Sequence, residues 1–382
     1  MRVPMYDLRA DYLSMQSAID AAIRRVLESG TLTMGHEVRA FEEHFARYCG
    51  ARHAVGVGSG TAAVQLALLA CRAGPGDEVI TVPNTDIPTT MAISHCGASI
   101  VWVDVHPRTF NMDPGRLREK ITRRTKVILP VHLFGHPADM DPILDIARSE
   151  GVRVIEDAAL AVGATYRGRK VGTIGDAGCF SLAPTKILGA TGDAGIVTTG
   201  DDDIAARVKV LRNYGHDLSM DDQDGLVAGV RLWRLIAEGF NERLDSLHAA
   251  VLTAKLPALD DCIVRRRRIA ERYRELLDGL AAVLPHEEPG VTHVYRTFPI
   301  LVQDKDHVRR HLAARGIATH AYYTPLLHLQ PVYRHLGFGA GAFPIAESIA
   351  DRLVCLPIFP TMSDEQLAEV AAAVRECVPA AA

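Results

Sequence analysis

Short apolar segments alternate with helical repeats through the first two thirds of the chain. Each segment is rich in Val and Ile, and most are followed by a stretch whose apolar residues recur every three or four positions. Such alternation predicts strand–helix–strand units and a mostly parallel sheet with helices on both faces, which is an α/β fold. The expected strands are 54–57, 79–82, 99–103, 126–131 and 152–155, and the clearest expected helices are 15–29, 62–71 and 139–150.

The pattern changes in the last third of the chain. A single long helix is expected over 247–280, followed by a strand at 297–302 and a helix at 307–315. A chain of 382 residues is also longer than one small core can organise. The sequence therefore predicts a large domain in residues 1–248 and a smaller α+β domain in residues 249–382.

The charge balance excludes some classes of partner. There are 42 basic and 46 acidic side chains, so the net charge is 42 − 46 = −4, which argues against a nucleic-acid-binding protein. The basic run at 265–268 lies in the expected long helix and is interpreted as a solvated helix face. No apolar run is long enough to span a membrane, and residues 1–4 do not resemble a secretion signal. We therefore expect neither a nucleic acid nor a membrane as partner.

The cysteines and histidines suggest neither disulfides nor a metal. The seven cysteines are scattered, odd in number and without a C-x-x-C pair, as in a protein of the reducing cytoplasm. His132, His136 and His328 are not accompanied by a convergent set of carboxylates. We therefore expect a cytoplasmic protein without a metal site.

The most informative residue is Lys186. It lies between Pro184, which fixes its own backbone angle, and a glycine-rich segment that begins at Gly189. A lone lysine is usually a solvated surface residue, but one held between two turns is held in a defined place. Lysine amines form Schiff bases with carbonyl cofactors, and pyridoxal phosphate (PLP) is the commonest of these. The hypothesis requires an acid for the pyridine nitrogen and a cup for the phosphate.

Both requirements have candidates upstream of the lysine. Asp157 ends an expected strand, where ligands of parallel sheets bind, so it is either the partner of a pyridine nitrogen or a helix N-cap. Gly60 and Thr61 join a strand to a helix whose N-terminus favours an anion, and Ser181 adds a hydroxyl.

A dinucleotide-binding fold is the main rival for the glycine-rich loop. The loop Gly-Val-Gly-Ser-Gly-Thr at 56–61 has Thr61 where the third glycine of G-x-G-x-x-G is required. The chain also has no G-x-x-x-x-G-K-[ST] motif. A phosphate cup for PLP therefore fits the sequence better than a site for NAD or ATP.

Four motifs in a fixed order suggest a family. They are Ser-Gly-Thr at 59–61, Glu-Asp-Ala-Ala at 156–159, Phe-Ser with Thr-Lys at 180–186, and Gly-Phe-Asn-Glu-Arg-Leu-Asp at 239–245. Together they resemble the DegT/DnrJ/EryC1/StrS family of PLP-dependent sugar aminotransferases, which have the fold of type I PLP enzymes. The resemblance runs nearly end to end, from Glu-Ser-Gly at 28–30 to Leu-Pro at 356–357.

The resemblance implies roles for individual residues. Lys186 would carry the cofactor and shuttle the proton, and Asp157 would pair with the pyridine nitrogen. Gly60, Thr61 and Ser181 would bind the phosphate. Asn241, which follows a polar loop at 217–225, resembles the asparagine that reaches the phosphate from a second subunit; a core or loop role is the alternative. The family likeness thus implies a homodimer with shared active sites.

Two departures from the family concern the cofactor's surroundings. Leu160 stands where the family usually has a glutamine near the phenolic oxygen, and Asp86 stands where it usually has an aromatic stacked on the ring. Both positions are still expected at the cofactor; for Asp86 the alternatives are a contact to the substrate or a shifted loop.

The resemblance also implies a reaction. Lys186 is present where the family's dehydratases have histidine, which favours transamination. The implied substrates are L-glutamate as amino donor and a nucleotide-linked keto-deoxysugar as acceptor. The alternatives are a cyclitol ketone as acceptor, or a regulatory protein that keeps the fold without turnover.

Overall fold

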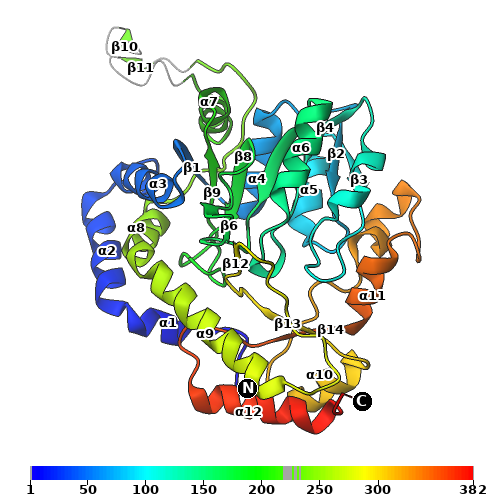
Figure 1. Ribbon diagram of the computed structural model, residues 1–382. Helices are drawn as coiled ribbons and strands as arrows, with labels where there is room; N and C mark the ends of the chain where they lie inside the picture. The colour runs from blue at the N-terminus through cyan, green and yellow to red at the C-terminus, as the bar shows by residue number, and fades with distance from the viewer. Residues whose placement is uncertain (1, 218–225, 228–229, 232–233, 382) are drawn as a thin grey trace.

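The computed structural model describes residues 2–217, 226–227, 230–231 and 234–381. Residues 218–225 of the polar loop expected at 217–225 therefore lie outside the described residues. Figure 1 shows a larger part built around a central sheet and a smaller part below it, where both chain ends lie.

A twisted sheet organises the larger part. Within the described residues it has seven strands in the spatial order β1, β9, β8, β5, β4, β2, β3. Every neighbouring pair from β3 to β8 is parallel, and only β9 runs antiparallel to its neighbours β8 and β1. The expected α/β fold with a mostly parallel sheet is confirmed. The strands are β1 (His53–Val57), β2 (Glu78–Thr81), β3 (Ser99–Trp102), β4 (Thr125–Ile128), β5 (Arg153–Asp157), β8 (Ala177–Ser181) and β9 (Gly195–Thr199).

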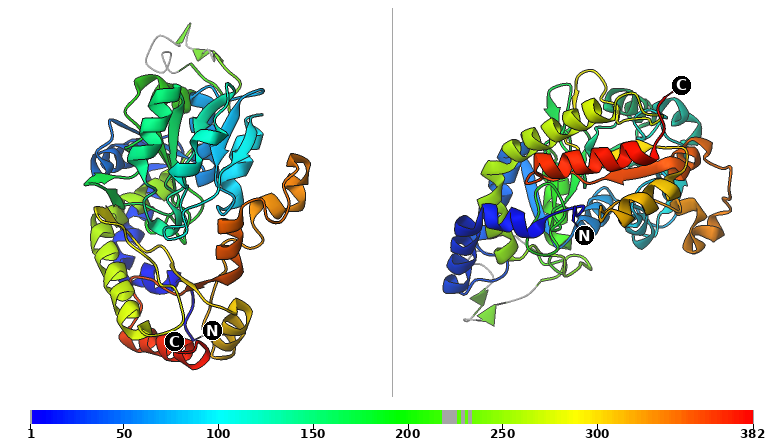
Figure 2. Two further views of the ribbon diagram at one scale, coloured as in Figure 1. Left: turned by 45° about the vertical axis from the view of Figure 1, so that its right-hand side comes forward. Right: turned by 90° about the horizontal axis from the view of Figure 1, so that it is seen from below.

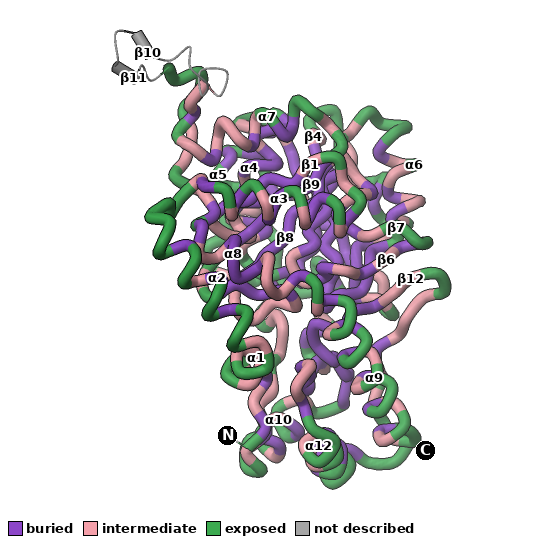
Figure 3. Tube along the Cα trace, turned by 90° about the vertical axis from the view of Figure 1, so that its left-hand side faces the viewer, coloured by how far each residue is buried: buried purple, intermediate pink, exposed green. Residues whose placement is uncertain are grey.

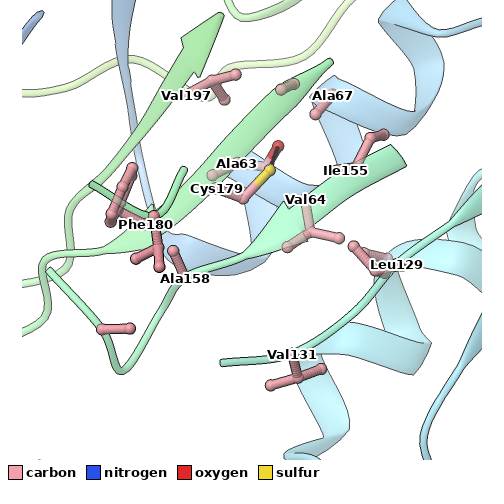
Figure 4. Packing of buried hydrophobic residues seen from close by; sticks show 14 of the residues in the cluster. Ala63, Val64, Ala67, Leu129, Val131, Ile155, Ala158, Cys179, Phe180 and Val197 are labelled. Carbon is pink, nitrogen blue, oxygen red and sulfur yellow. Dashed lines mark hydrogen bonds between the residues drawn. The ribbon is translucent and has the colours of Figure 1, made fainter. Parts of the chain in front are cut away.

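Helix α4 (Gly60–Ala70) is the centre of the core. Its residues are almost all apolar around the whole helix, as expected for a helix enclosed on every side. Figure 4 shows Ala63, Val64 and Ala67 of this helix packed toward Cys179 of β8 and Ile155 of β5. This packing fixes the N-terminus of α4 against the ends of the two strands that carry Asp157 and Ser181.

The other helices of the larger part surround this core. α2 and α3 pack against α8, and Figure 3 shows outer turns of α2 exposed while the trace around β8 and β9 is buried. The bounds are α1 (Leu8–Ser14), α2 (Gln16–Ser29), α3 (His36–Cys49), α5 (Ile87–His95), α6 (Met140–Glu150), α7 (Asp202–Leu211) and α8 (Ser246–Lys255). Short strands complete this part: β6 (Thr165–Tyr166), β7 (Arg169–Lys170), β10 (Leu226–Val227), β11 (Val230–Arg231) and β12 (Val291–Thr292).

A second core lies in the smaller part. Tyr273, Phe298 and Val354 are buried there, and so is Val3, which pairs with Ile317 and so ties the N-terminal segment to this core. Figure 2 shows α9, α10 and α12 gathered around the strand pair in both views. The elements are α9 (Leu259–Leu277), β13 (Phe298–Leu301), α10 (Lys305–Ala314), α11 (Pro344–Arg352), β14 (Leu353–Leu356) and α12 (Asp364–Cys377). The division at residues 248 and 249 stays a prediction.

The single long helix expected over 247–280 is wrong. The chain forms α8, a short 3-10 turn over Leu256–Ala258, and then α9. Pro257 explains the break, because it has no backbone N–H and its ring clashes with the preceding turn of an α-helix. The turn lets α8 stay with the large core while α9 enters the small one.

The basic run at 265–268 is not simply a solvated face. Arg266 lies on the buried stripe of α9, together with Ile263 and Ala270, and is 4% exposed. Its Nη1 donates a hydrogen bond to the carbonyl oxygen of Ile358 at 2.8 Å. The side chain therefore links α9 to the segment that follows β14.

Two further findings concern the cysteines and the helices. All seven cysteines are free, and five of them are buried. Among the described residues, no helix combines the length and the apolar character needed to cross a membrane.

Candidate active site

A pocket of about 230 Å³ opens at the carboxyl ends of β5 and β8, beside the N-terminus of α4. Ligands of parallel sheets bind at this edge. Seven of the eight residues expected at the cofactor line this one pocket, namely Gly60, Thr61, Asp86, Asp157, Leu160, Ser181 and Lys186. They come from segments far apart in the sequence, so the sheet brings them together.

The N-terminus of α4 forms a cup for an anion. Ser59 caps the helix by accepting a hydrogen bond from the N–H of Ala62 at 3.1 Å, and the first turn at Gly60 and Thr61 lines the pocket. A Cβ added to Gly60 would lie 2.5 Å from the Cβ of Ser181, so only glycine permits this close approach. The N-terminal N–H groups, the helix dipole and the Ser181 hydroxyl suit a phosphate group.

Asp157 is held firmly at the end of β5. Its side chain accepts hydrogen bonds from the Thr89 hydroxyl at 2.8 Å and from the N–H of Ala159 at 3.1 Å. Burial raises the pKa of Asp157, while these two donors and the charge of Lys186 lower it. The residues that follow Asp157 form turns, so it does not cap a helix. A buried carboxylate with few donors is suited to a cationic ligand atom.

Lys186 is fixed by the loop that carries it. Its own N–H donates to the carbonyl oxygen of Ala183 at 2.9 Å, and the N–H of Ala190 donates to that of Leu182 at 2.8 Å. Burial, followed by the positive charge of Arg296, lowers the pKa of Lys186 to about 8. A larger share of this amine than of an ordinary lysine is therefore neutral, and so nucleophilic, near pH 7.

A family model agrees with this geometry. The model of the DegT/DnrJ/EryC1/StrS aminotransferase family matches residues 14–375. The chain belongs to this family.

Individual relatives of the DegT/DnrJ/EryC1/StrS family match over nearly the whole chain. The erythromycin biosynthesis sensory transduction protein EryC1 of Saccharopolyspora erythraea is 44% identical, over 98% of this chain and 99% of that one. The dTDP-3-amino-3,4,6-trideoxy-alpha-D-glucose transaminase of Streptomyces venezuelae is 42% identical, over 98% and 96%. The crystal structure of S. venezuelae DesV, in complex with a ketimine intermediate, has a TM-score of 0.92 at 42% identity and covers 98% of both chains.

The cofactor follows from the family and the fold. A structure of NtdA from Bacillus subtilis, 29% identical with a TM-score of 0.87, holds the cofactor PMP and covers 95% of this chain and 82% of that one. The protein is a PLP-dependent aminotransferase. The pocket fits PLP because it has an anion cup, a buried carboxylate and a lysine amine within one cavity.

The two departures from the DegT/DnrJ/EryC1/StrS pattern also line the pocket. Asp86 is exposed and caps α5, where its Oδ1 accepts from the N–H of Ile87 at 2.8 Å. Leu160 offers no polar atom in its side chain. Tyr323, from the segment after α10, also lines the pocket and supplies an aromatic ring there.

Sequence reasoning missed several pocket residues. Thr89 bonds to Asp157 and also to Thr85, with 2.8 Å between the two hydroxyl oxygens. Thr85 lies before α5, which begins at Ile87, so the i, i+4 spacing of a helix gave no signal for the two threonines. Tyr323 gave no signal either, because its place depends on how the smaller part of the molecule packs.

Asn241 does not line the pocket of its own chain. It is exposed and lies opposite Asn213 in an isolated β-bridge. The expected contact with a phosphate therefore stays a prediction that requires a second subunit.

His132, one of the histidines considered as a metal ligand, takes part in a buried hydrogen-bond network. His132 is fully buried; its Nδ1 accepts from the N–H of Ala138 at 2.9 Å, and its Nε2 lies 3.0 Å from Glu156 Oε2. Glu156 also accepts hydrogen bonds from the N–H groups of Gly172 and Ile174. This network fixes the end of β5 next to Asp157. Within the described ranges no group of three or more His, Cys, Asp or Glu is placed to hold a metal ion.

The low pKa of Lys186 predicts the pH profile of covalent PLP attachment. Only the neutral amine attacks the aldehyde, so the attachment rate should fall about tenfold per pH unit below pH 8 and level off above it. The measurement is stopped-flow absorbance after mixing PLP with the apoprotein between pH 6 and 10. A rate that still rises tenfold per unit above pH 9 would indicate an ordinary lysine and contradict this assignment.

Proposed function

We propose that this aminotransferase moves an amino group from L-glutamate to a nucleotide-linked keto-deoxysugar, in amino-sugar biosynthesis. The observation that carries the proposal is the single pocket that joins Lys186, Asp157 and the cup at Gly60 and Ser181. The similarity to a transaminase of a dTDP-linked amino sugar supports the substrate class. The free, mostly buried cysteines support a place in the reducing cytoplasm.

Each pocket residue has a defined task. When bound, PLP supplies an aldehyde and an electron-withdrawing ring. The helix N-terminus at Gly60 and Thr61, with the Ser181 hydroxyl, would hold the phosphate. Asp157 would keep the pyridine nitrogen protonated. The amine of Lys186 would hold the cofactor between reactions and move the proton from the α-carbon of the donor.

Asp86 and Leu160 are proposed to shape the ring's surroundings. Asp86 would offer a polar contact to the cofactor or substrate, and Leu160 an apolar one. Tyr323, which no sequence pattern indicated, would add an aromatic ring to the wall of the pocket.

The test is an assay of the purified protein with L-glutamate against a panel of nucleotide-linked keto-sugars, with 2-oxoglutarate formation as the readout. Conversion of at least one keto-sugar supports the proposal. A protein that aminates only cyclitol ketones such as keto-inositols would instead support the cyclitol alternative.

A regulatory role is the second candidate, because EryC1 is named as a sensory transduction protein. The pocket argues for catalysis, since Lys186, Asp157 and Ser181 are all present and gathered in one cavity. Mixing the PLP form with glutamate alone distinguishes the two: an aminotransferase loses its PLP absorbance within seconds to minutes, whereas a protein without turnover keeps it.

The active protein is proposed to be a homodimer in which Asn241 of each chain reaches the partner's phosphate cup. The exposure of Asn241, outside its own pocket, supports this arrangement. A two-fold interface is self-complementary, so one such contact creates two composite sites.

Complementation between inactive variants should therefore restore activity. In a heterodimer of Lys186→Ala and Asn241→Asp, one site carries both lesions and the other carries neither. Random subunit exchange should recover about a quarter of wild-type activity, because half of the dimers are mixed and each has one intact site. The measurement is turnover after exchange, with mass spectrometry of the intact dimers to confirm mixing.

The matched control mixes Lys186→Ala with Asp157→Asn, whose lesions lie in the same chain's pocket. Every heterodimer site then has one lesion, and no activity should return. Equal recovery in both mixtures, or none in either despite confirmed exchange, would rule out the shared site.

A further inference from the structure

Arg296 is a buried cation without a counter-charge. It is 4% exposed, and its Nε and Nη1 are buried without a hydrogen-bond acceptor. Within the part of the chain that the structure describes, no carboxylate forms an ion pair with it. Leaving a buried guanidinium unpaired is costly, and an anion carried by a bound molecule would remove that cost.

The backbone of Arg296 lies against the wall of the active-site pocket. A Cβ added to Gly135 would lie 3.1 Å from the carbonyl oxygen of Leu160 and 3.2 Å from the backbone nitrogen of Arg296. The two residues thus meet on one side of Gly135, and Leu160 lines the pocket. The N–H of Arg296 donates to the carbonyl oxygen of Phe134 at 2.9 Å, which fixes this position.

Tyr6 and Tyr322 connect the Arg296 guanidinium to a residue that lines the pocket. The carbon of the Arg296 guanidinium lies 4.3 Å from the centre of the Tyr6 ring. The hydroxyl of Tyr6 is 2.6 Å from that of Tyr322, and the next residue, Tyr323, lines the pocket. A cation stacked on a ring keeps the edges of its planar fork available for an acceptor.

The charge of Arg296 also reaches the reacting amine. After burial, it is the largest influence that lowers the pKa of Lys186, and it affects Tyr323 as well. An anion bound by Arg296 would therefore lie close to the centre of the reaction.

We propose that Arg296 binds the α-carboxylate of the amino-acid donor, a role that rests on the proposed aminotransferase function. This carboxylate is attached to the carbon whose proton Lys186 removes, so it must lie beside that amine. The diphosphate of a nucleotide sugar is separated from the keto carbon by several bonds of the sugar ring. A planar guanidinium also matches a carboxylate through two parallel hydrogen bonds.

The first test measures the donor half-reaction of the PLP form in single turnovers. Arg296→Met should lower kcat/KM for L-glutamate about 100-fold, because the variant loses a buried charged partner. The rate with 4-aminobutyrate, which lacks the α-carboxylate, should change by less than about twofold, as expected when the lost contact is to that group alone.

The control variant is Arg274→Met. Arg274 also stacks on a tyrosine, 5.4 Å from the centre of the Tyr295 ring, but its Nη2 already donates to the carbonyl oxygen of Pro285 at 3.0 Å. Its kcat/KM for glutamate should stay near the wild-type value. If Arg296→Met behaves like Arg274→Met, the proposal is wrong.

A binding measurement separates this proposal from the proposed function. Glutarate, which is glutamate without its amino group, is titrated calorimetrically into the PLP-loaded protein. Arg296→Met should weaken its binding at least about tenfold, as for the loss of a charged hydrogen bond. If the wild type does not react with glutamate, the proposed donor is wrong, and the glutarate titration still decides whether Arg296 is a carboxylate site.

Arg296→Lys decides the matter if Arg296→Met does not fold. Lysine keeps the charge but not the planar fork, so glutamate turnover should fall about tenfold while PLP absorbance is unchanged. Wild-type turnover in Arg296→Lys, with unchanged glutarate affinity, would overturn the proposal.

Discussion

Lys186→Ala should abolish covalent attachment of PLP and lower kcat by at least about 10⁴-fold, because one amine serves as both the attachment point and the proton shuttle. In the wild type, borohydride reduction followed by peptide mass spectrometry should place the cofactor on Lys186. In the variant no lysine should carry it.

Lys255→Ala is the matched control for this experiment. Its Nζ donates to the carbonyl oxygen of Gly189, in the same loop as Lys186, at 2.9 Å and lies 2.7 Å from Asp11. It does not line the pocket. Loss of Lys255 should disturb the loop and leave attachment intact. An adduct on any lysine other than Lys186 would refute the assignment.

Asp157→Asn should lower kcat by about 10²- to 10³-fold, the usual effect of removing one preorganised electrostatic contact from an active site. PLP binding should stay measurable, because asparagine keeps the shape of the side chain and can accept from the N–H of Ala159. The missing charge leaves a protonated pyridine nitrogen unsupported. Single-turnover absorbance with glutamate measures the effect.

Thr89→Val provides the comparison for Asp157→Asn. It removes the hydroxyl that donates to Asp157 and keeps the carboxylate, so about a tenfold loss is expected from one hydrogen bond to a charged group. We therefore expect kcat to be highest in the wild type, about tenfold lower in Thr89→Val, and lowest in Asp157→Asn. Near-normal turnover in Asp157→Asn would remove the carboxylate from the mechanism.

The sequence by itself determined the fold class, because strand and helix periods are local properties of the chain. The alternation of apolar runs and helical repeats predicted the parallel sheet, and the N-terminus of α4 and Asp157 were expected at strand ends. Ligand sites of such sheets lie at the carboxyl ends of strands, so placing strands also placed these residues near one another. The order of the motifs then indicated the family.

The expectations drawn from the local sequence pattern were wrong at two residues, one that interrupts a helix and one that turns into the core. Pro257 divides the expected long helix, although the apolar repeat continues through it. Arg266 turns inward because its position on α9 faces the small core, while its neighbours in the basic run face outward or lie at the edge. The break follows from the proline itself, which the apolar repeat does not register, whereas the inward turn of Arg266 depends on what packs against α9.

Only the tertiary structure decided which distant side chains meet at the pocket. Thr89 reaches Asp157, Tyr323 arrives from the smaller part of the molecule, and Arg296 is left as a buried cation over the ring of Tyr6. The pKa of Lys186 follows from the same packing, because burial and the charge of Arg296 act through space. These contacts join residues far apart along the chain, and no local period records them. The choice of Lys186 as the candidate therefore came from the sequence, and the lowered pKa of its amine follows from the fold.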